Sequence, residues 1–257
     1  MTSSKKPFDV AVVGGGIAGL VLTIGLLKKN VPVTLYEAAQ SFGEIGAGVS
    51  FGPNAARAMS LIDPAIEEGF QRRATSNLWE SKRDFWFDFR TGQKKKGDES
   101  EPGKLVYQLK CEHGQVSVHR AHFLDEMVRL VPKEIARFHK RLVDLDDQGE
   151  KGVVLKFADG TEARHAAVIG TDGIKSRTRQ IVLGENNPAA KAVFSGKYAY
   201  RGLIPMEEAI EHLGEELATN SQMYMGYHGH ILTFPIEKGR TMNGNPPISR
   251  MCVCIDN

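Results

Sequence analysis

Three glycines, at positions 14, 16 and 19, follow a short valine-rich run and precede apolar residues that recur at helical spacing. Between a strand and a helix, the first glycine permits a tight turn and the second lets the backbone approach a pyrophosphate. The third lets the helix pack closely on the strand. N–H groups at the start of the helix then face the phosphates. The residues expected to bind the pyrophosphate of a dinucleotide are therefore Gly14, Gly16, Ile17, Ala18 and Gly19.

The segments around these glycines predict a strand–helix–strand unit. Residues 8–13 and 31–36 are β-rich, apolar runs, and the helix between them begins at Ile17 and ends near Lys29. Asn30 occupies the position where a left-handed helix cap is favoured. Glu37 closes the second strand about 20 residues beyond the glycines, where a carboxylate accepts the ribose hydroxyls of a bound dinucleotide. The alternative is a glycine-rich turn with a purely structural role.

The glycine motif alone is compatible with either FAD or NAD, and a second motif favours FAD. Residues 167–179 contain an apolar strand, then Thr171-Asp172-Gly173, then Ser176-x-x-Arg179. This segment resembles the Asp-Gly motif of the FAD-dependent aromatic hydroxylases, in which an apolar strand precedes Gly-Ala-Asp-Gly and Ser-x-x-Arg. Thr171 stands where that family usually has alanine. The resemblance implies that Asp172 and Gly173 lie at the ribityl–pyrophosphate part of the flavin; the alternative is an Asp-Gly turn that caps a helix.

Other stretches resemble the same family, most closely the salicylate-hydroxylase-like monooxygenases, and the likeness covers about residues 8–243. Residues 44–48 are similar to the flavin-side loop, which implies cofactor contacts at Ala47 and Gly48. Arg120 matches an arginine that reaches the flavin chain, or it caps a helix or forms a salt bridge. Arg57 either reaches the flavin edge or is a surface charge.

The resemblance also suggests residues of a substrate domain. Arg201, expected on the strand face opposite Tyr198 and Tyr200, faces either a substrate carboxylate or solvent. Tyr224 either lines an aromatic pocket or packs in the core. Neither a metal site nor a catalytic side chain is expected, because the flavin carries the chemistry.

The function implied by the resemblance is hydroxylation of a phenolic acid similar to salicylate, with FAD as cofactor and NAD(P)H and O2 as co-substrates, and in a salicylate-like case with loss of CO2. The alternative is a truncated, non-catalytic fragment that binds a dinucleotide weakly or not at all. A third hypothesis, an NAD-dependent dehydrogenase, does not explain residues 167–179.

The predicted fold class is α/β: a Rossmann-like FAD-binding domain with a parallel sheet, interleaved with a partial antiparallel-sheet substrate domain. We expect the FAD-binding domain in residues 1–75 and 104–184, and the substrate domain in residues 76–103 and 185–243. The pattern predicts strands near residues 85–89 (followed by a turn at 90–92), 141–146, 153–157, 166–170, 191–206 and 222–236. It also predicts helices that begin near residues 53, 120 and 176, and one helix over residues 206–217.

Bulk composition excludes several partners. The chain has 257 residues, a hydrophobic fraction of 41% and a formal net charge of +2, so neither nucleic acid nor a membrane surface is expected to bind it. Residues 10–27 are uncharged, but glycines interrupt them early, which argues against a membrane span. Three sparse cysteines predict free thiols, and we expect a cytoplasmic protein whose oligomeric state the sequence leaves open.

The C-terminal segment departs from the family pattern. A Gly-Asp motif that contacts the ribityl group is expected later in such chains, and the sequence does not contain that segment. Pro246 and Pro247 argue against a central strand. Residues 244–257 are therefore interpreted as a tail outside the family pattern, with the chain truncated.

Overall fold

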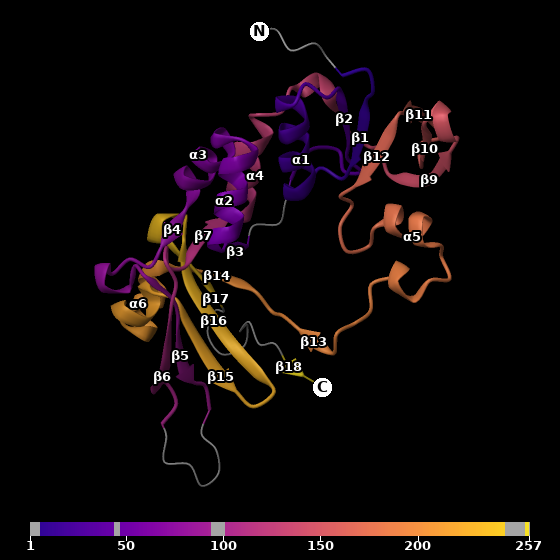
Figure 1. Ribbon diagram of the computed structural model, residues 1–257. Coiled ribbons are helices and arrows are strands. Elements are labelled where there is room, and N and C mark those ends of the chain that lie inside the picture. Colours follow the sequence, from indigo (N-terminus) through magenta and orange to yellow (C-terminus); the bar gives the residue numbers. More distant parts are fainter. Residues whose placement is uncertain (1–5, 44–46, 94–100, 245–254, 257) are drawn as a thin grey trace. The chain divides into compact units, whose positions relative to one another are not determined.

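The computed structural model describes residues 6–43, 47–93, 101–244 and 255–256, and it divides into two compact units (Figure 1). Unit 1 comprises residues 1–44, 59–67 and 124–193, and unit 2 comprises residues 45–58, 68–123 and 194–257. Three helices contribute residues to both: α2 (Pro53–Ile62), α3 (Pro64–Arg73) and α4 (Arg120–Val128). Among the described residues, no helix has both the length and the apolar character needed to cross a membrane.

Unit 1 is built on a four-stranded parallel sheet in the order β12-β1-β2-β8. A three-stranded antiparallel sheet, β11-β10-β9, belongs to the same unit. The strands are β1 (Val10–Val13), β2 (Val33–Tyr36), β8 (Ala136–Arg137), β9 (Leu142–Asp147), β10 (Val153–Phe157), β11 (Glu162–His165) and β12 (Ala167–Gly170). The helices are α1 (Ile17–Lys28) and α5 (Arg177–Leu183), with short turns η2 (Lys133–Ile135), η3 (Gly149–Lys151) and η4 (Pro188–Ala190).

The predicted strand–helix–strand unit is confirmed. Strand β1 lies between β2 and β12, and all four of its residues are buried, as expected for a parallel sheet covered on both faces. Helix α1 ends with Lys28 in its last turn, and Asn30 adopts a left-handed φ of 57°. A buried cluster then joins the two sheets of unit 1; its members are Ala11, Val13, Tyr36, Leu142, Leu155 and Phe157.

Unit 2 contains a six-stranded sheet in the order β14-β17-β16-β15-β5-β6. Its strands pair antiparallel, except that β15 and β5 are parallel. A smaller sheet has the order β3-β7-β4, and β13 pairs with β18. The bounds are β3 (Gly48–Ser50), β4 (Thr75–Ser76), β5 (Phe85–Thr91), β6 (Leu105–Lys110), β7 (Val116–His119), β13 (Lys197–Tyr198), β14 (Gly202–Pro205), β15 (Gln222–Gly226), β16 (Gly229–Ile236), β17 (Thr241–Gly244) and β18 (Ile255–Asp256).

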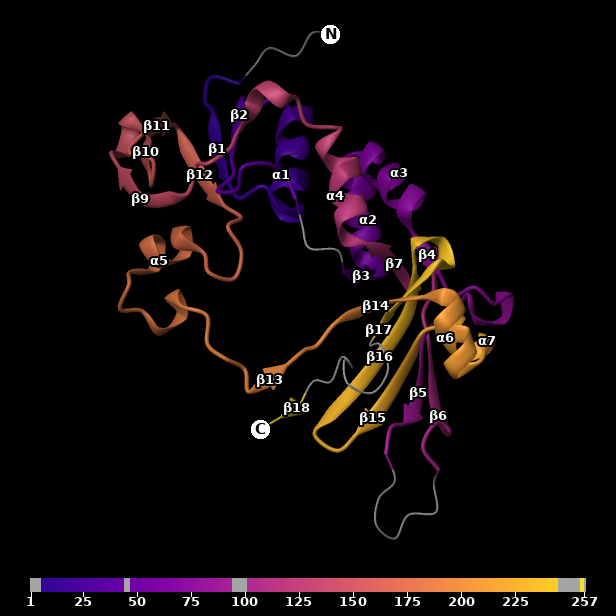
Figure 2. The same ribbon diagram turned by 180° about the vertical axis from the view of Figure 1, so that it is seen from behind.

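Two helices, α6 (Met206–Leu213) and α7 (Glu215–Thr219), lie beside this six-stranded sheet (Figure 2). Buried Met206 and Ala209 of α6 and Ala218 of α7 pack against Ile204 and Met242 of the sheet. The unit also contains the short turns η1 (Glu80–Lys82) and η5 (Glu237–Gly239). Parallel and antiparallel sheets thus occur together, and the predicted α/β class is confirmed.

Several predicted boundaries in unit 2 are wrong. The turn expected at residues 90–92 begins too early, because β5 continues through Arg90 to Thr91. Arg90 lies within the sheet because its guanidinium donates hydrogen bonds to Gln222 Oε1 at 2.7 Å and to the Gly103 carbonyl at 2.9 Å. The single helix expected over residues 206–217 is two helices, since Gly214 adopts a φ of 79° that ends α6. The expected strand at 191–206 is limited to β13 and β14. Pro246 and Pro247 lie outside the described residues.

Candidate functional site

The glycine turn between β1 and α1 has the geometry that its sequence predicts. Gly14 has a φ of 107°, and a Cβ there would lie 2.5 Å from the Thr171 carbonyl oxygen. A Cβ on Gly19 would lie 1.9 Å from the Gly14 carbonyl oxygen. Contacts below 3.0 Å against backbone cannot be relieved by side-chain rotation. A larger residue at either position therefore forces strand and helix apart.

The start of α1 offers hydrogen-bond donors to an anion. Gly16 is the N-cap and provides no side-chain cap, and the first helical bond runs from Leu20 N to Gly16 O at 3.0 Å. The N–H groups of Ile17, Ala18 and Gly19 therefore precede the helical hydrogen-bond pattern. Ala18 is exposed, and the first turn contains no acidic residue. The positive end of the helix dipole is thus open to a phosphate.

Glu37 stabilises this turn through two hydrogen bonds. Its Oε2 accepts a hydrogen bond from Gly15 N at 2.6 Å, and its Oε1 accepts one from Ala39 N at 2.7 Å. Each carboxylate oxygen has a second lone pair with which it can accept a ribose hydroxyl. The position of Glu37 at the end of β2 is as predicted, and its contact with a ribose stays a prediction.

Asp172 hydrogen-bonds to the first turn of α5, whose N-cap is Ser176. Asp172 Oδ2 accepts hydrogen bonds from Arg177 N at 2.7 Å and Thr178 N at 3.0 Å, and Oδ1 accepts one from the Ser176 hydroxyl at 2.5 Å. Gly173 has a left-handed φ of 77°. The geometry therefore satisfies the capping interpretation, and the flavin contact remains untested.

Thr171 ties this segment to the glycine turn. Its Oγ1 lies 2.9 Å from the carbonyl oxygens of Val13 and Gly14, and its backbone N–H donates to Val13 O at 2.8 Å. One hydroxyl proton is thus shared between two acceptors. The residue that departs from the family pattern adds a link between β12 and the turn that alanine does not provide.

The remaining cofactor candidates belong to unit 2. Ala47 O accepts a hydrogen bond from Arg120 N at 3.0 Å, and Gly48 N donates to the buried Asn243 Oδ1 at 2.9 Å. These bonds fix the C-terminal end of the predicted flavin-side loop to β7 and β17; residues 44–46 lie outside the described residues. Arg57 on α2 and Arg120 at the start of α4 are both exposed.

Of the two substrate candidates, Arg201 differs from its expected placement. It is exposed and lies between β13 and β14, so it is not on a strand face opposite Tyr198 and Tyr200. The predicted alternation requires a continuous strand over 191–206. Since that segment forms only two short strands, alternation does not fix where Arg201 points.

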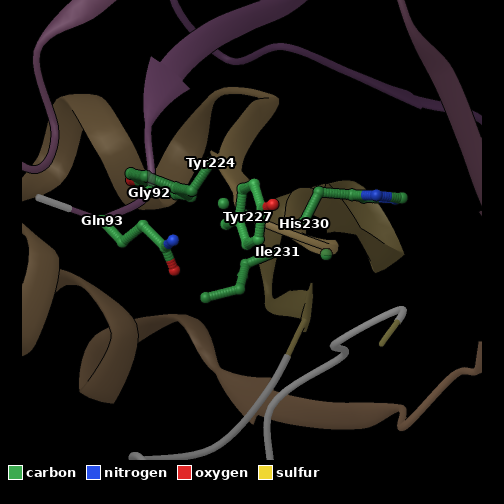
Figure 3. A pocket seen from close by; sticks show the side chains of 8 residues that line it. Gly92, Gln93, Tyr224, Tyr227, His230 and Ile231 are labelled. Carbon is green, nitrogen blue, oxygen red and sulfur yellow. The ribbon is translucent and has the colours of Figure 1, made fainter. Parts of the chain in front are cut away.

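Tyr224 lies beside a pocket of about 120 Å³ (Figure 3). Figure 3 shows Gln93, Tyr227 and Ile231 near the same space. The full lining is Gly92, Gln93, Tyr224, Gly226, Tyr227, Gly229, His230 and Ile231. The hydroxyl of Tyr224 is buried and has no hydrogen-bond partner among the described residues. Burial raises the pKa of Tyr224, and the nearby Arg90 guanidinium opposes that rise.

Sequence reasoning missed a chain of hydrogen-bonded polar side chains in unit 1, in which Tyr36 and His165 are buried and Asp9 is partly exposed. Tyr36 Oη lies 2.8 Å from His165 Nε2, and His165 Nδ1 lies 2.7 Å from Asp9 Oδ2. Partial burial of Asp9 opposes ionisation, but hydrogen bonds from Ala166 N and His165 outweigh it and hold the pKa of Asp9 below its usual value. Burial raises the pKa of Tyr36. Asp9 and His165 precede β1 and β12, and only the pairing of those strands brings them together.

Comparisons with known proteins agree with this architecture. A family model described as an NAD(P)-binding Rossmann-like domain matches residues 12–55. The 6-methylsalicylate 1-monooxygenase of Aspergillus terreus is 48% identical over 247 residues, which cover 95% of this chain and 54% of that protein. The salicylate hydroxylase of Pseudomonas putida is 44% identical over 252 residues, which cover 95% of this chain and 55% of that protein.

Among solved structures, a salicylate hydroxylase substrate complex aligns with a TM-score of 0.77 and 34% identity. The alignment covers 99% of this chain and 57% of that one. The chain spans about half the length of the curated relatives cited above. The similarity extends through both compact units, well beyond the segment that the family model matches.

Proposed function

The chain belongs to the FAD-dependent monooxygenases related to salicylate hydroxylase, and from that premise we propose that it binds FAD for the hydroxylation of a phenolic acid. NAD(P)H and O2 are the proposed co-substrates. The observation that carries the proposal is the glycine turn: neither Gly14 nor Gly19 has room for a Cβ, and the first N–H groups of α1 lie open beyond them.

The residues of unit 1 fit the dinucleotide part of FAD. The N–H groups at the start of α1 bind the pyrophosphate, and the helix dipole stabilises its negative charge. Glu37 accepts hydroxyls of the adenosine ribose with the lone pairs that Gly15 N and Ala39 N leave available. Thr171 holds the turn against β12. The bound flavin supplies the transfer of oxygen to the ring.

The pocket beside Tyr224 is the proposed contact for a phenolic substrate. Tyr224 lines this pocket, and a turn of its side chain toward the space would let its buried hydroxyl donate a hydrogen bond to a phenol oxygen or carboxylate. That bond removes the cost of a buried polar group without a partner. Gln93 and His230 add polar atoms to a lining that is otherwise tyrosine, isoleucine and glycine. An aromatic ring with one or two polar substituents matches this combination.

The decisive experiment is a titration of the purified 257-residue chain with FAD, followed by quenching of flavin fluorescence. We expect saturable quenching and a visible flavin spectrum, with Glu37→Gln weakening FAD binding about tenfold. Glu68→Gln is the matched control, because Glu68 is exposed on α3. Absence of quenching, or equal binding by Glu37→Gln and the parent chain, would contradict the assignment of this site.

A second assay tests turnover. Oxidation of NADPH and NADH is followed with the FAD-loaded chain, with and without salicylate or 6-methylsalicylate. Substrate-stimulated oxidation with a hydroxylated product supports the monooxygenase. Tight FAD binding with no stimulated oxidation supports the alternative, a dinucleotide-binding polypeptide without turnover.

A further inference from the structure

We propose that His119, His122 and Glu237 form a binding site for a divalent transition-metal ion, with Zn²⁺ as the ligand. One side-chain ligand atom from each residue lies within 4.8 Å of the other two. Two imidazoles and one carboxylate form a common three-residue zinc set, with water as the fourth ligand. His119 pairs with Gly48 and precedes Arg120, which are both flavin candidates, but none of the three ligand residues is itself a proposed flavin or substrate contact.

The junction between β7 and α4 positions the two histidines. His119 is the last residue of β7, and His122 lies in the first turn of α4. Their ring centroids are 4.1 Å apart, with planes tilted by 30°. Two protonated imidazoles at this separation repel each other, whereas two neutral rings can donate lone pairs to one shared cation.

Glu237 completes the set from η5. Its Oε1 lies 3.5 Å from His122 Nδ1, and its Oε2 accepts a hydrogen bond from the Thr241 hydroxyl at 2.6 Å. Around a tetrahedral zinc ion with bonds of about 2.1 Å, neighbouring ligand atoms are about 3.4 Å apart. The His122–Glu237 pair already has this spacing, and rotation of the side chains accounts for the rest.

Glu237 lies in the hairpin turn between β16 and β17, whose conformation is fixed by contacts with β4. Glu237 and Lys238 have φ values of 53° and 59°, a region that residues other than glycine rarely occupy. Lys238 N donates to Thr75 Oγ1 at 2.8 Å, which fixes the turn to β4. Left-handed residues are common in such hairpin turns. The turn presents Glu237, whose Oε1 lies 3.5 Å from His122 Nδ1.

The ligand chemistry selects the ion. Mg²⁺ and Ca²⁺ prefer a full set of oxygen ligands, whereas imidazole nitrogen favours zinc and its neighbours in the first transition row. The alternative to a metal site is a simple ion pair between His122 and Glu237, which requires a protonated histidine. Zinc binding distinguishes the metal site from the ion pair, because only the metal site binds Zn²⁺ with both His122 and Glu237 as ligands.

The test is a calorimetric titration of ZnCl₂ into the 257-residue, chelator-treated chain with Cys111, Cys252 and Cys254 replaced by serine, since thiols also bind zinc. We expect one ion per chain and a rise in the thermal unfolding midpoint with added zinc. His122→Ala should weaken binding at least tenfold, and Thr241→Val about tenfold through loss of the bond that orients Glu237. His113→Ala, which alters an exposed histidine, should bind zinc like the parent, and MgCl₂ should give no binding.

Two results would overturn the proposal: no saturable zinc binding by the parent chain, or zinc binding that both His122→Ala and Glu237→Gln leave unchanged. Circular dichroism without metal checks that each variant folds. If His122→Ala does not fold, His122→Gln keeps a polar side chain of similar reach and replaces it in the comparison. The flavin titration described above is read separately, so failure of one site is distinguishable from failure of the other.

Discussion

Thr171 shows what one hydroxyl adds to the glycine turn. Replacing Thr171 with alanine removes the hydrogen bond shared between the carbonyls of Val13 and Gly14 while leaving its backbone bond to Val13. We expect a loss of about 1 kcal/mol in the free energy of unfolding, measured by urea denaturation. Thr171→Ser keeps the donor and should lose less than half as much. Equal losses for the two variants would mean that the methyl group, and not the hydroxyl, stabilises the turn.

Removing the hydroxyl of Tyr224, unlike removing that of Thr171, should not lower the free energy of unfolding. Its buried hydroxyl has no partner among the described residues, so Tyr224→Phe removes an unsatisfied polar group without opening a cavity. The free energy of unfolding should stay the same or rise by up to about 1 kcal/mol. Affinity for salicylate, measured by fluorescence, should fall about tenfold. Tyr227→Phe, at a mostly exposed tyrosine of the same pocket, is the control; a clear loss of stability in Tyr224→Phe would indicate a missed hydrogen bond.

The sequence alone predicts the local contacts of some residues but not the contacts that depend on strand pairing. The glycine turn is predictable because its requirement is local: the strand, the turn and the helix are consecutive, and Gly14 and Gly19 meet within them. The contact of Thr171 with Gly14 is not local, since it depends on β12 pairing beside β1. For the same reason the chain Asp9–His165–Tyr36 has no sequence signal. Its three members come from separate segments that only the folded sheet brings together.

At the scale of elements, α5 depends on its cap. The helix has seven residues, and Asp172 accepts hydrogen bonds from the backbone of Arg177 and Thr178 at its first turn. Asp172→Ala should lower the free energy of unfolding by about 2 kcal/mol and speed amide exchange at Arg177 and Thr178. Asp125→Ala, at an exposed position of α4, should change stability little. Unchanged exchange at residues 177 and 178 would show that packing and the Ser176 N-cap hold α5 without Asp172.

The elements that sequence reasoning misplaced have two different causes. A β-rich pattern over residues 191–206 states a preference, but a strand forms only where a partner strand is available. In the structure that stretch pairs at β13 and at β14, and Arg201 falls between them. The break between α6 and α7 is local, since Gly214 supplies a left-handed residue at a helix end. Placement of Arg201 required tertiary information; the helix break did not.

For the whole molecule, carboxyl groups with lowered pKa values contribute a part of the stability that depends on pH. Burial, outweighed by hydrogen bonds from Ala166 N and His165, leaves the pKa of Asp9 lowered; the Ala65 amide lowers that of Asp63, and Lys140 lowers that of Asp159. A lowered folded-state pKa means that the unfolded chain binds more protons near the unfolded pKa values. Stability is therefore fully present above about pH 4 and is lost as pH falls through the folded pKa values.

This pH dependence can be tested at Asp9, the partly exposed end of the Asp9–His165–Tyr36 hydrogen-bonded series. We compare the free energy of unfolding of the parent chain with that of Asp9→Asn between about pH 2.5 and 6. The difference should be largest near pH 6. Below about pH 4 the difference should shrink, because protonation of Asp9 removes from the parent the same charge that the amide lacks. Asp125→Asn, at an exposed carboxyl, should give a difference that does not vary with pH in this way. A parent–Asp9→Asn difference that stays constant over the range would mean that the Asp9–His165 contact stabilises the fold through geometry and not through the carboxylate charge.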